Sequence, residues 1–221
     1  MSDAGARRLD APAFHRNHGP IGDVLCAHLA DVSGSALEIG SGTGQHVVNF
    51  AARLPDLSWW PTDPDKSHLR SIEAWREVSG APNVNPPVFL DAGEEDWALG
   101  GRGRPPDCVE AILSLNVVHI APWFVAEGIL RGAGRYLSDT GCLFLYGPFK
   151  RHGRHTAESN ARFDATLRAR DPRWGVRDVA DLEFCAEACG LALEKSVHMP
   201  ANNQILLFRR STWGLDVRSS P

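Results

Sequence analysis

The stretch LEIGSGTGQH at residues 37–46 decides the fold class of this 221-residue chain. Its apolar residues are typical of a strand end, and the alternating glycines are typical of the turn into the first helix of an open α/β sheet. The dinucleotide fingerprint G-x-G-x-x-G would need its third glycine at position 45, where this chain has Gln45. The acidic residue before the first glycine is also foreign to that fingerprint. The turn therefore predicts a nucleoside cofactor without a pyrophosphate, bound by Glu38, Gly40, Ser41, Gly42, Gly44 and Gln45.

Strand and helix patterns alternate along the rest of the chain. Strands are predicted at residues 35–39, 57–63, 86–91, 109–116 and 142–146, and helices at 20–29, 44–54, 69–78, 122–137, 161–170 and 181–188. Two last strands, 193–198 and 205–209, form an expected antiparallel pair. This order predicts one doubly wound, mostly parallel α/β domain over residues 1–221. We expect an irregular segment at 1–19, with Pro20 as the first helical residue, a substrate-side insert at 147–178 and a frayed tail at 211–221.

Polar residues follow the predicted strands at the edge where such sheets bind ligands. Asp63 is placed to accept bonds from ribose hydroxyls, and Asp91, followed by Ala92, from an adenine amino group. Asn116 ends the fourth strand beside the expected reacting centre. Two other interpretations stay open, because Asp63 could cap a helix and Asp91 could be a turn residue. With the glycine turn, this set is best matched by S-adenosylmethionine (SAM).

Composition limits the partners. The net charge of −4 and the absence of a basic face argue against nucleic acid, and no apolar run approaches the ~18 residues of a membrane span. An odd number of cysteines without C-x-x-C argues against a disulfide framework or a zinc site, and H-x-x-H at 15–18 and 152–155 is too weak to predict a metal. We expect a cytoplasmic protein acting on a small molecule, with its oligomeric state open.

Several longer segments carry a resemblance to a known family. They are 11–13 with Arg16-Asn17 and Pro20-Ile21, 37–46, Leu90-Asp91, 116–123, 146–149, 156–160, Phe163-Asp164, Leu167-Arg168, 174–178 and 199–203. In these segments the chain resembles class I SAM-dependent methyltransferases, and more narrowly the methyltransferase-like protein 26 family and its bacterial relatives. The resemblance implies a seven-stranded Rossmann-like sheet with an antiparallel last strand, and SAM bound at the glycine turn, Asp63 and Asp91. It implies no substrate.

Candidates for acceptor chemistry lie near the predicted methyl group. His119, three residues after Asn116, is the expected general base, although it could instead cap the next helix. Tyr146 could orient the acceptor or pack in the core. The predicted substrate-binding residues are Asn17, His18, Arg168, Arg177 and Asn202. For the two arginines the alternative is a salt bridge with Asp164 or Asp178, and for Asn202 a hairpin turn.

The leading hypothesis is therefore a methyltransferase acting on an O, N or S atom of a small molecule. The alternatives are an NAD(P)-dependent oxidoreductase, which the glycine spacing disfavours, and a non-catalytic SAM-binding module. Residues 85–88, NPPV, resemble the N-P-P-aromatic signature of enzymes that methylate exocyclic amines. They precede a strand and lack the aromatic residue, so we interpret them as a loop.

Overall fold

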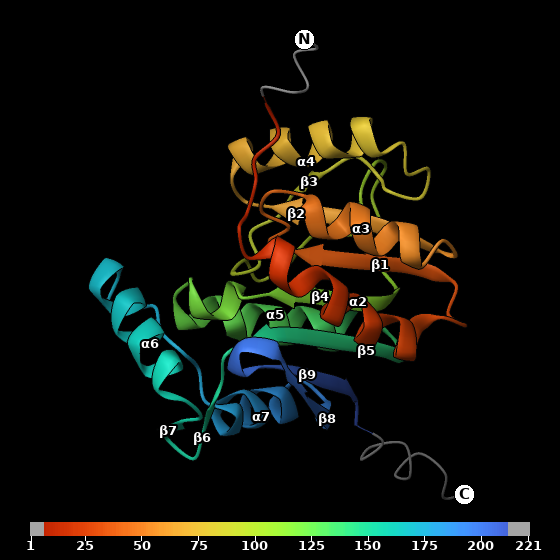
Figure 1. Ribbon diagram of the computed structural model, residues 1–221. Coiled ribbons are helices and arrows are strands. Elements are labelled where there is room, and N and C mark those ends of the chain that lie inside the picture. Colours follow the sequence, from red (N-terminus) through yellow and green to blue (C-terminus); the bar gives the residue numbers. More distant parts are fainter. Residues whose placement is uncertain (1–6, 212–221) are drawn as a thin grey trace, which may run out of the picture.

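A computed structural model describes residues 7–211, which form one seven-stranded sheet. Its strand order is β3-β2-β1-β4-β5-β9-β8 (Figure 1). The strands are β1 Gly34–Ile39, β2 Leu57–Asp63, β3 Val88–Phe89, β4 Val109–Leu115, β5 Leu137–Gly147, β8 Leu191–Met199 and β9 Asn203–Arg210. The first five are parallel, and β9 runs antiparallel to both β5 and β8. The predicted fold, including the antiparallel last strand, is confirmed.

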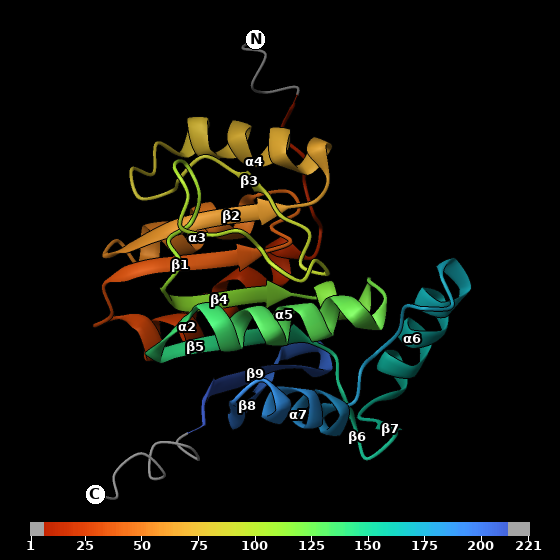
Figure 2. The same cartoon turned by 180° about the vertical axis from the view of Figure 1, so that it is seen from behind.

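Helices cover both faces of the sheet (Figures 1 and 2). Helices α2 (Phe14–Leu29), α3 (Gln45–Arg53) and α4 (Lys66–Ser79) lie on one side, and α5 (Trp123–Tyr136) and α7 (Val179–Ala188) on the other. Each side buries its own apolar cluster, centred on Phe50 and Trp59 under α2 and α3, and on Ile129 and Phe208 under α5 and α7. From β1 the chain adds β2 and β3 on one side of the sheet, and it then returns to add β4 and β5 on the other side. A ligand site is expected at this switch point, beyond the carboxyl ends of β1 and β4.

The N-terminal helix begins earlier than its sequence predicts. It starts at Phe14, and Pro20 lies inside it, so Pro20 as the first helical residue and an irregular 14–19 were both wrong. Proline removes one backbone hydrogen bond from a helix interior. The fully buried face formed by Ile21, Leu25 and Leu29 offsets that loss by packing against the sheet.

Strand boundaries differ where tertiary pairing extends or shortens them. β5 begins at Leu137 because Leu137 pairs with Val109 of β4, and β3 is only two residues long. The glycines of α5 do not interrupt it: a Cβ on Gly128 would lie 1.9 Å from the carbonyl oxygen of Ala92, so the glycine permits the close approach of that loop.

The predicted insert at 147–178 contains its own elements. They are the hairpin strands β6 (Lys150–Arg151) and β7 (Arg154–His155), which were not predicted, and helix α6 (Glu158–Arg170). Helix α6 stands away from the sheet on the side where the parallel strands end (Figure 1). Two short 3-10 helices, η1 (Val117–His119) and η2 (Pro200–Asn202), complete that end.

No helix within residues 7–211 is both long and apolar enough to cross a membrane. Apart from Ser211, the predicted frayed tail lies outside the described residues.

Candidate functional site

A cavity of about 630 Å³ opens at the carboxyl ends of β1, β2 and β4, and we call it the glycine-turn cavity. Most of the residues predicted to bind a cofactor line it: Glu38, Gly40, Ser41, Gly42, Asp63, Asp91, Ala92 and Asn116. Gly44 and Gln45 are not among its described lining residues. His46, His68, Ile120 and Trp174 also line it, and the sequence pattern did not indicate them.

Two glycines of the turn have different roles. Gly42 has φ +57°, and a Cβ placed on it would meet nothing within 4 Å, so the backbone leaves the cavity open there. Gly44 has φ +89°, and a Cβ would lie 2.7 Å from the Cα of Ile72 in α4. Gly42 therefore shapes the cavity, whereas Gly44 allows α3 and α4 to pack closely.

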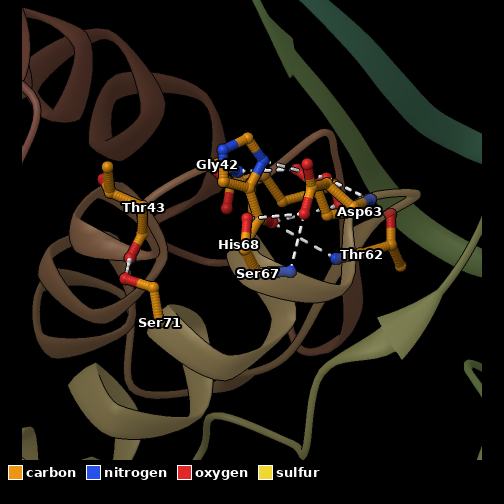
Figure 3. A network of polar contacts seen from close by, with 10 residues as sticks. Gly42, Thr43, Thr62, Asp63, Ser67, His68 and Ser71 are labelled. Atoms are coloured by element: carbon orange, nitrogen blue, oxygen red, sulfur yellow. Dashed lines mark hydrogen bonds and ion pairs between the residues drawn. The ribbon is translucent and has the colours of Figure 1, made fainter. Parts of the chain in front are cut away.

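Asp63 joins the end of β2 to the glycine turn (Figure 3). Its Oδ2 accepts from the backbone N–H of Gly42 at 2.9 Å, and its Oδ1 accepts from that of Asp65 at 2.9 Å and contacts His68 Nδ1 at 3.1 Å. The cap of α4 is Asp65, which accepts from Ser67 N at 2.6 Å, so the capping role considered for Asp63 falls two residues later. A carboxylate has about four acceptor positions, which leaves Asp63 capacity for a ligand.

Glu38 is a buried carboxylate in the wall of the same cavity. Its side chain is about 1% exposed, and Oε2 has no partner among the described residues. Burial raises the pKa of Glu38 to about 7; a hydrogen bond with the Ser41 side chain opposes this shift, and the charge of Asp63 adds to it. A buried, unpaired carboxylate is costly unless a cation or donor reaches it. Glu38 Oε2 therefore has free acceptor capacity in the wall of this cavity.

Asp91 stabilises a turn, which is the alternative role that its sequence position left open. Its Oδ1 accepts from Gly93 N at 2.9 Å, which closes an Asx turn two residues beyond β3. The side chain also lines the glycine-turn cavity, so the two interpretations are compatible.

Gln45 anchors the segment at residues 8–13, which we call the N-terminal strap. Its Oε1 accepts from Ala11 N and its Nε2 donates to Asp10 Oδ1, both at 2.8 Å. Ser71 of α4 also accepts from Leu9 N at 2.8 Å. The strap places Ala11 and Ala13 in the cavity wall. Gln45 thus acts on the cavity through the strap.

A second cavity of about 520 Å³, the insert cavity, lies between α2, β5, α6 and the η2 turn. Its lining residues are Ala13, Arg16, Asn17, Pro20, Asn116, Tyr146, Pro148, Ser159, Asn160, Phe163, Met199, Pro200, Ala201 and Asn203. Ala13, Asn17 and Asn116 line both cavities, so the two meet at these residues. Of the residues predicted for the acceptor, Asn17 and Tyr146 lie here.

The other residues predicted to bind substrate are held elsewhere. His18 Nδ1 contacts Phe14 O at 2.8 Å, and Arg168 donates to Asp164 at 3.2 Å, the salt bridge considered as its alternative. Arg177 donates to the backbone carbonyls of Val118, Ala121 and Arg173. Asn202, in the turn between β8 and β9, donates to Ser159 Oγ at 3.1 Å. None of these four is among the described lining residues of either cavity.

His119 is fully buried behind the insert cavity, where its ring packs edge-on against Phe149. Burial, and next the charge of Arg177, lower its pKa to about 3. Nδ1 accepts from Arg177 N at 3.3 Å, so the proton of the neutral ring is on Nε2, which has no partner among the described residues. In this arrangement His119 has no free basic nitrogen, and it lines neither cavity.

The model of the family described as "Protein of unknown function (DUF938)" matches residues 8–210, nearly the whole chain. The chain belongs to this family. The matched range includes the strap, the glycine turn, the insert and the antiparallel strand pair.

Solved structures share the fold at low sequence identity. The mitomycin 7-O-methyltransferase MmcR is 19% identical, with a TM-score of 0.72 over 88% of this chain and 54% of that chain. A methyltransferase of calicheamicin biosynthesis, CalO1, solved in its SAH-bound form, is 17% identical, with a TM-score of 0.66 over 87% and 54%. An O-methyltransferase family protein from Burkholderia thailandensis is 15% identical, with a TM-score of 0.69 over 90% and 57%. The chain spans about half the length of these structures.

Proposed function

We propose that the protein is a SAM-dependent methyltransferase that transfers a methyl group to an O, N or S atom of a small molecule. The observation that carries this proposal is the meeting of two cavities at Asn17 and Asn116. Methyl transfer is an in-line displacement, so it requires donor and acceptor sites that share an opening. The glycine-turn cavity is the donor site in this proposal, and the insert cavity is the acceptor site.

The residues of the glycine-turn cavity fit SAM. The unpaired carboxylate of Glu38 suits the ammonium group of the methionine moiety, and the open space at Gly42 leaves room against the backbone. Asp63 has acceptor capacity for ribose hydroxyls, and Asp91 lines the cavity as a candidate for the adenine amino group. The N–H groups in the first turn of α3 lack intrahelical partners and suit a carboxylate.

SAM, when bound, supplies an electrophilic methyl group on a sulfonium. The chain's own residues then enclose and orient the acceptor. Phe163, Met199 and three prolines give the insert cavity apolar walls, and Tyr146 and Asn116 add polar groups to its lining. Positioning of this kind is a major contribution to displacement reactions.

The comparisons bear on one finer part of the proposal, the acceptor atom. Structures described as O-methyltransferases share this fold, which favours oxygen among the possible acceptor atoms. On the sequence segments given above, we also propose a relation to the methyltransferase-like protein 26 family. A single domain over residues 1–221 and a cytoplasmic location are proposed as well.

Isothermal titration calorimetry tests the donor site. We expect SAM and S-adenosylhomocysteine to bind, and NADP not to bind. Glu38→Gln should weaken both, whereas Glu95→Gln, an exposed carboxylate in the loop after Asp91, should leave them unchanged. Absence of binding by either adenosyl compound would contradict the proposal, and NADP binding would favour an oxidoreductase.

A further inference from the structure

The phenol of Tyr146 lines the insert cavity, and its oxygen accepts a hydrogen bond. The amide of Asn203 donates to its oxygen at 2.9 Å, and the side chain of Asn17 also acts on the phenol and favours its ionised form. No described residue accepts its own proton. A phenol oxygen that accepts a hydrogen bond still has its O–H to give. Burial raises the pKa of Tyr146, which keeps that proton on the oxygen.

Arg16 supplies a positive charge at the same cavity. It lies on the exposed side of α2, lines the cavity, and forms no ion pair with a described residue. Its charge acts on Tyr146, where it favours the ionised phenol and lowers the pKa. A guanidinium in the lining of the same cavity would also lower the free energy of an anion bound beside the Tyr146 hydroxyl.

The described lining of the insert cavity contains no aspartate, glutamate, histidine or lysine, so it offers no ordinary general base. The nearby carboxylates of Glu38, Asp63 and Asp91 line the glycine-turn cavity instead. His119, on the far side of Gly147, has its free nitrogen protonated, and its pKa is lowered to about 3. His46 and His68 also line the glycine-turn cavity and not the insert cavity. A neutral acceptor of high pKa would therefore find no ordinary base in the described lining of the insert cavity.

We infer that the acceptor is a ring-sized apolar acid that enters the insert cavity already ionised, with its charged oxygen against Arg16 and the Tyr146 hydroxyl and its ring against Phe163 and Met199. This inference rests on the proposed function. The anionic oxygen forms a bond to the methyl carbon, the carbon–sulfur bond breaks, and its electron pair stays on sulfur. Negative oxygen and positive sulfonium become a neutral ether or ester and a neutral thioether, so no proton is released.

A binding experiment without SAM tests the inference directly. The probes are 4-nitrophenol, 4-nitrobenzoate and neutral 4-nitrobenzamide, titrated into the full chain. We expect both acids to bind more tightly as anions than the amide binds, and the absorbance pKa of bound 4-nitrophenol to fall by about one unit, the scale set by a nearby opposite charge. Arg16→Gln and Tyr146→Phe should each reduce that shift. Arg162→Gln, an exposed charge on α6 outside the cavity lining, should leave it unchanged.

Preferential binding of the neutral amide, or a raised pKa of bound nitrophenol, would overturn the inference. A methyl-transfer assay forms the second arm, in which the phenol and the benzoate distinguish phenolate from carboxylate acceptors. Its kcat/KM should rise with pH through the pKa of the acceptor. If SAM binds but only amines are methylated, the inference fails and the proposed function stands. If SAM does not bind in the calorimeter, the proposed function fails, while the dye titration still decides whether the cavity binds anions.

Discussion

The two cavities share a wall but have opposite chemistry. The glycine-turn cavity has four carboxylates, Glu38, Asp63, Asp65 and Asp91, set at the ends of strands or just beyond them. The polar groups of the insert cavity are amides, one phenol, one serine hydroxyl and one guanidinium. In the proposed function, a cationic donor and an anionic acceptor would each find complementary groups in one of the two cavities.

The largest expected effect is on the free energy of unfolding, and it should distinguish Gly44, which allows close helix packing, from Gly42, which shapes the cavity. Gly44→Ala should lower the free energy of unfolding by about 2–5 kcal/mol, because a Cβ at positive φ also meets the Ile72 backbone. Gly42→Ala has the same backbone strain without that collision, so it should cost about 1–2 kcal/mol and weaken SAM binding. Urea denaturation with calorimetry measures both. Equal losses of stability would show that the α3–α4 contact is not the reason for Gly44.

The buried charge of Glu38 should lower the free energy of unfolding of the protein without ligand, and bound SAM should reduce this loss. Its folded pKa of about 7 lies above the ordinary value of 4.5, so its cost to stability is absent below pH 4.5, grows between pH 4.5 and 7, and is complete above pH 7. Without ligand, Glu38→Gln should therefore be more stable than the wild type at pH 8 by about 3 kcal/mol, and equal to it at pH 4. Denaturation curves at the two pH values test this. A Gln variant that is less stable at pH 8 would contradict the unpaired carboxylate.

Affinity for SAM should fall as pH falls through 7, since protonation of Glu38 removes the charge that attracts the ammonium group. In Glu38→Gln this pH dependence should disappear. Calorimetry between pH 6 and 8 gives the comparison.

Asp63→Ala should weaken SAM binding by about 1–3 kcal/mol, the scale of hydrogen bonds to a charged group. The substitution also frees the N–H groups of Gly42 and Asp65, so part of the loss arises from a looser turn. Asp56→Ala, an exposed aspartate before β2, is the control. An unchanged affinity for SAM would show that Asp63 only holds the end of β2 to the glycine turn.

The smallest expected effect concerns His119. Because its pKa is lowered to about 3, its ring should stay neutral from pH 5 to 8, and its imidazole NMR signals should not move in that range. A free histidine side chain titrates near ~6.5. Signals that titrate between pH 6 and 7 would restore His119 as a candidate base.

The same comparison explains what sequence alone could predict. The fold and the glycine-turn cavity follow from a local rule: parallel strands end at one edge, so Glu38, Asp63 and Asp91 could be placed from strand ends alone. Gln45 and Gly44 stand in the same motif, yet their tertiary contacts with the strap and with Ile72 have no local signature.

The insert cavity depends on contacts between distant segments. Asn203 reaches Tyr146 across 57 residues, and Asn160 reaches the Asn202 carbonyl across 42. Arg177 lies in a segment that resembles the known family, yet its guanidinium donates to backbone carbonyls and does not line either cavity. Residue type and approximate region were therefore insufficient to predict the lining of the insert cavity. The hydrogen-bond partners of these side chains follow only from the three-dimensional structure.

A crystal structure of the protein with S-adenosylhomocysteine tests the central claim most directly. The account predicts the ligand in the glycine-turn cavity, with its amino group bonded to Glu38, its ribose at Asp63 and its sulfur facing the insert cavity between Asn17 and Asn116. A ligand whose sulfur points away from that junction, or one bound outside the glycine-turn cavity with Glu38 still unpaired, would contradict it.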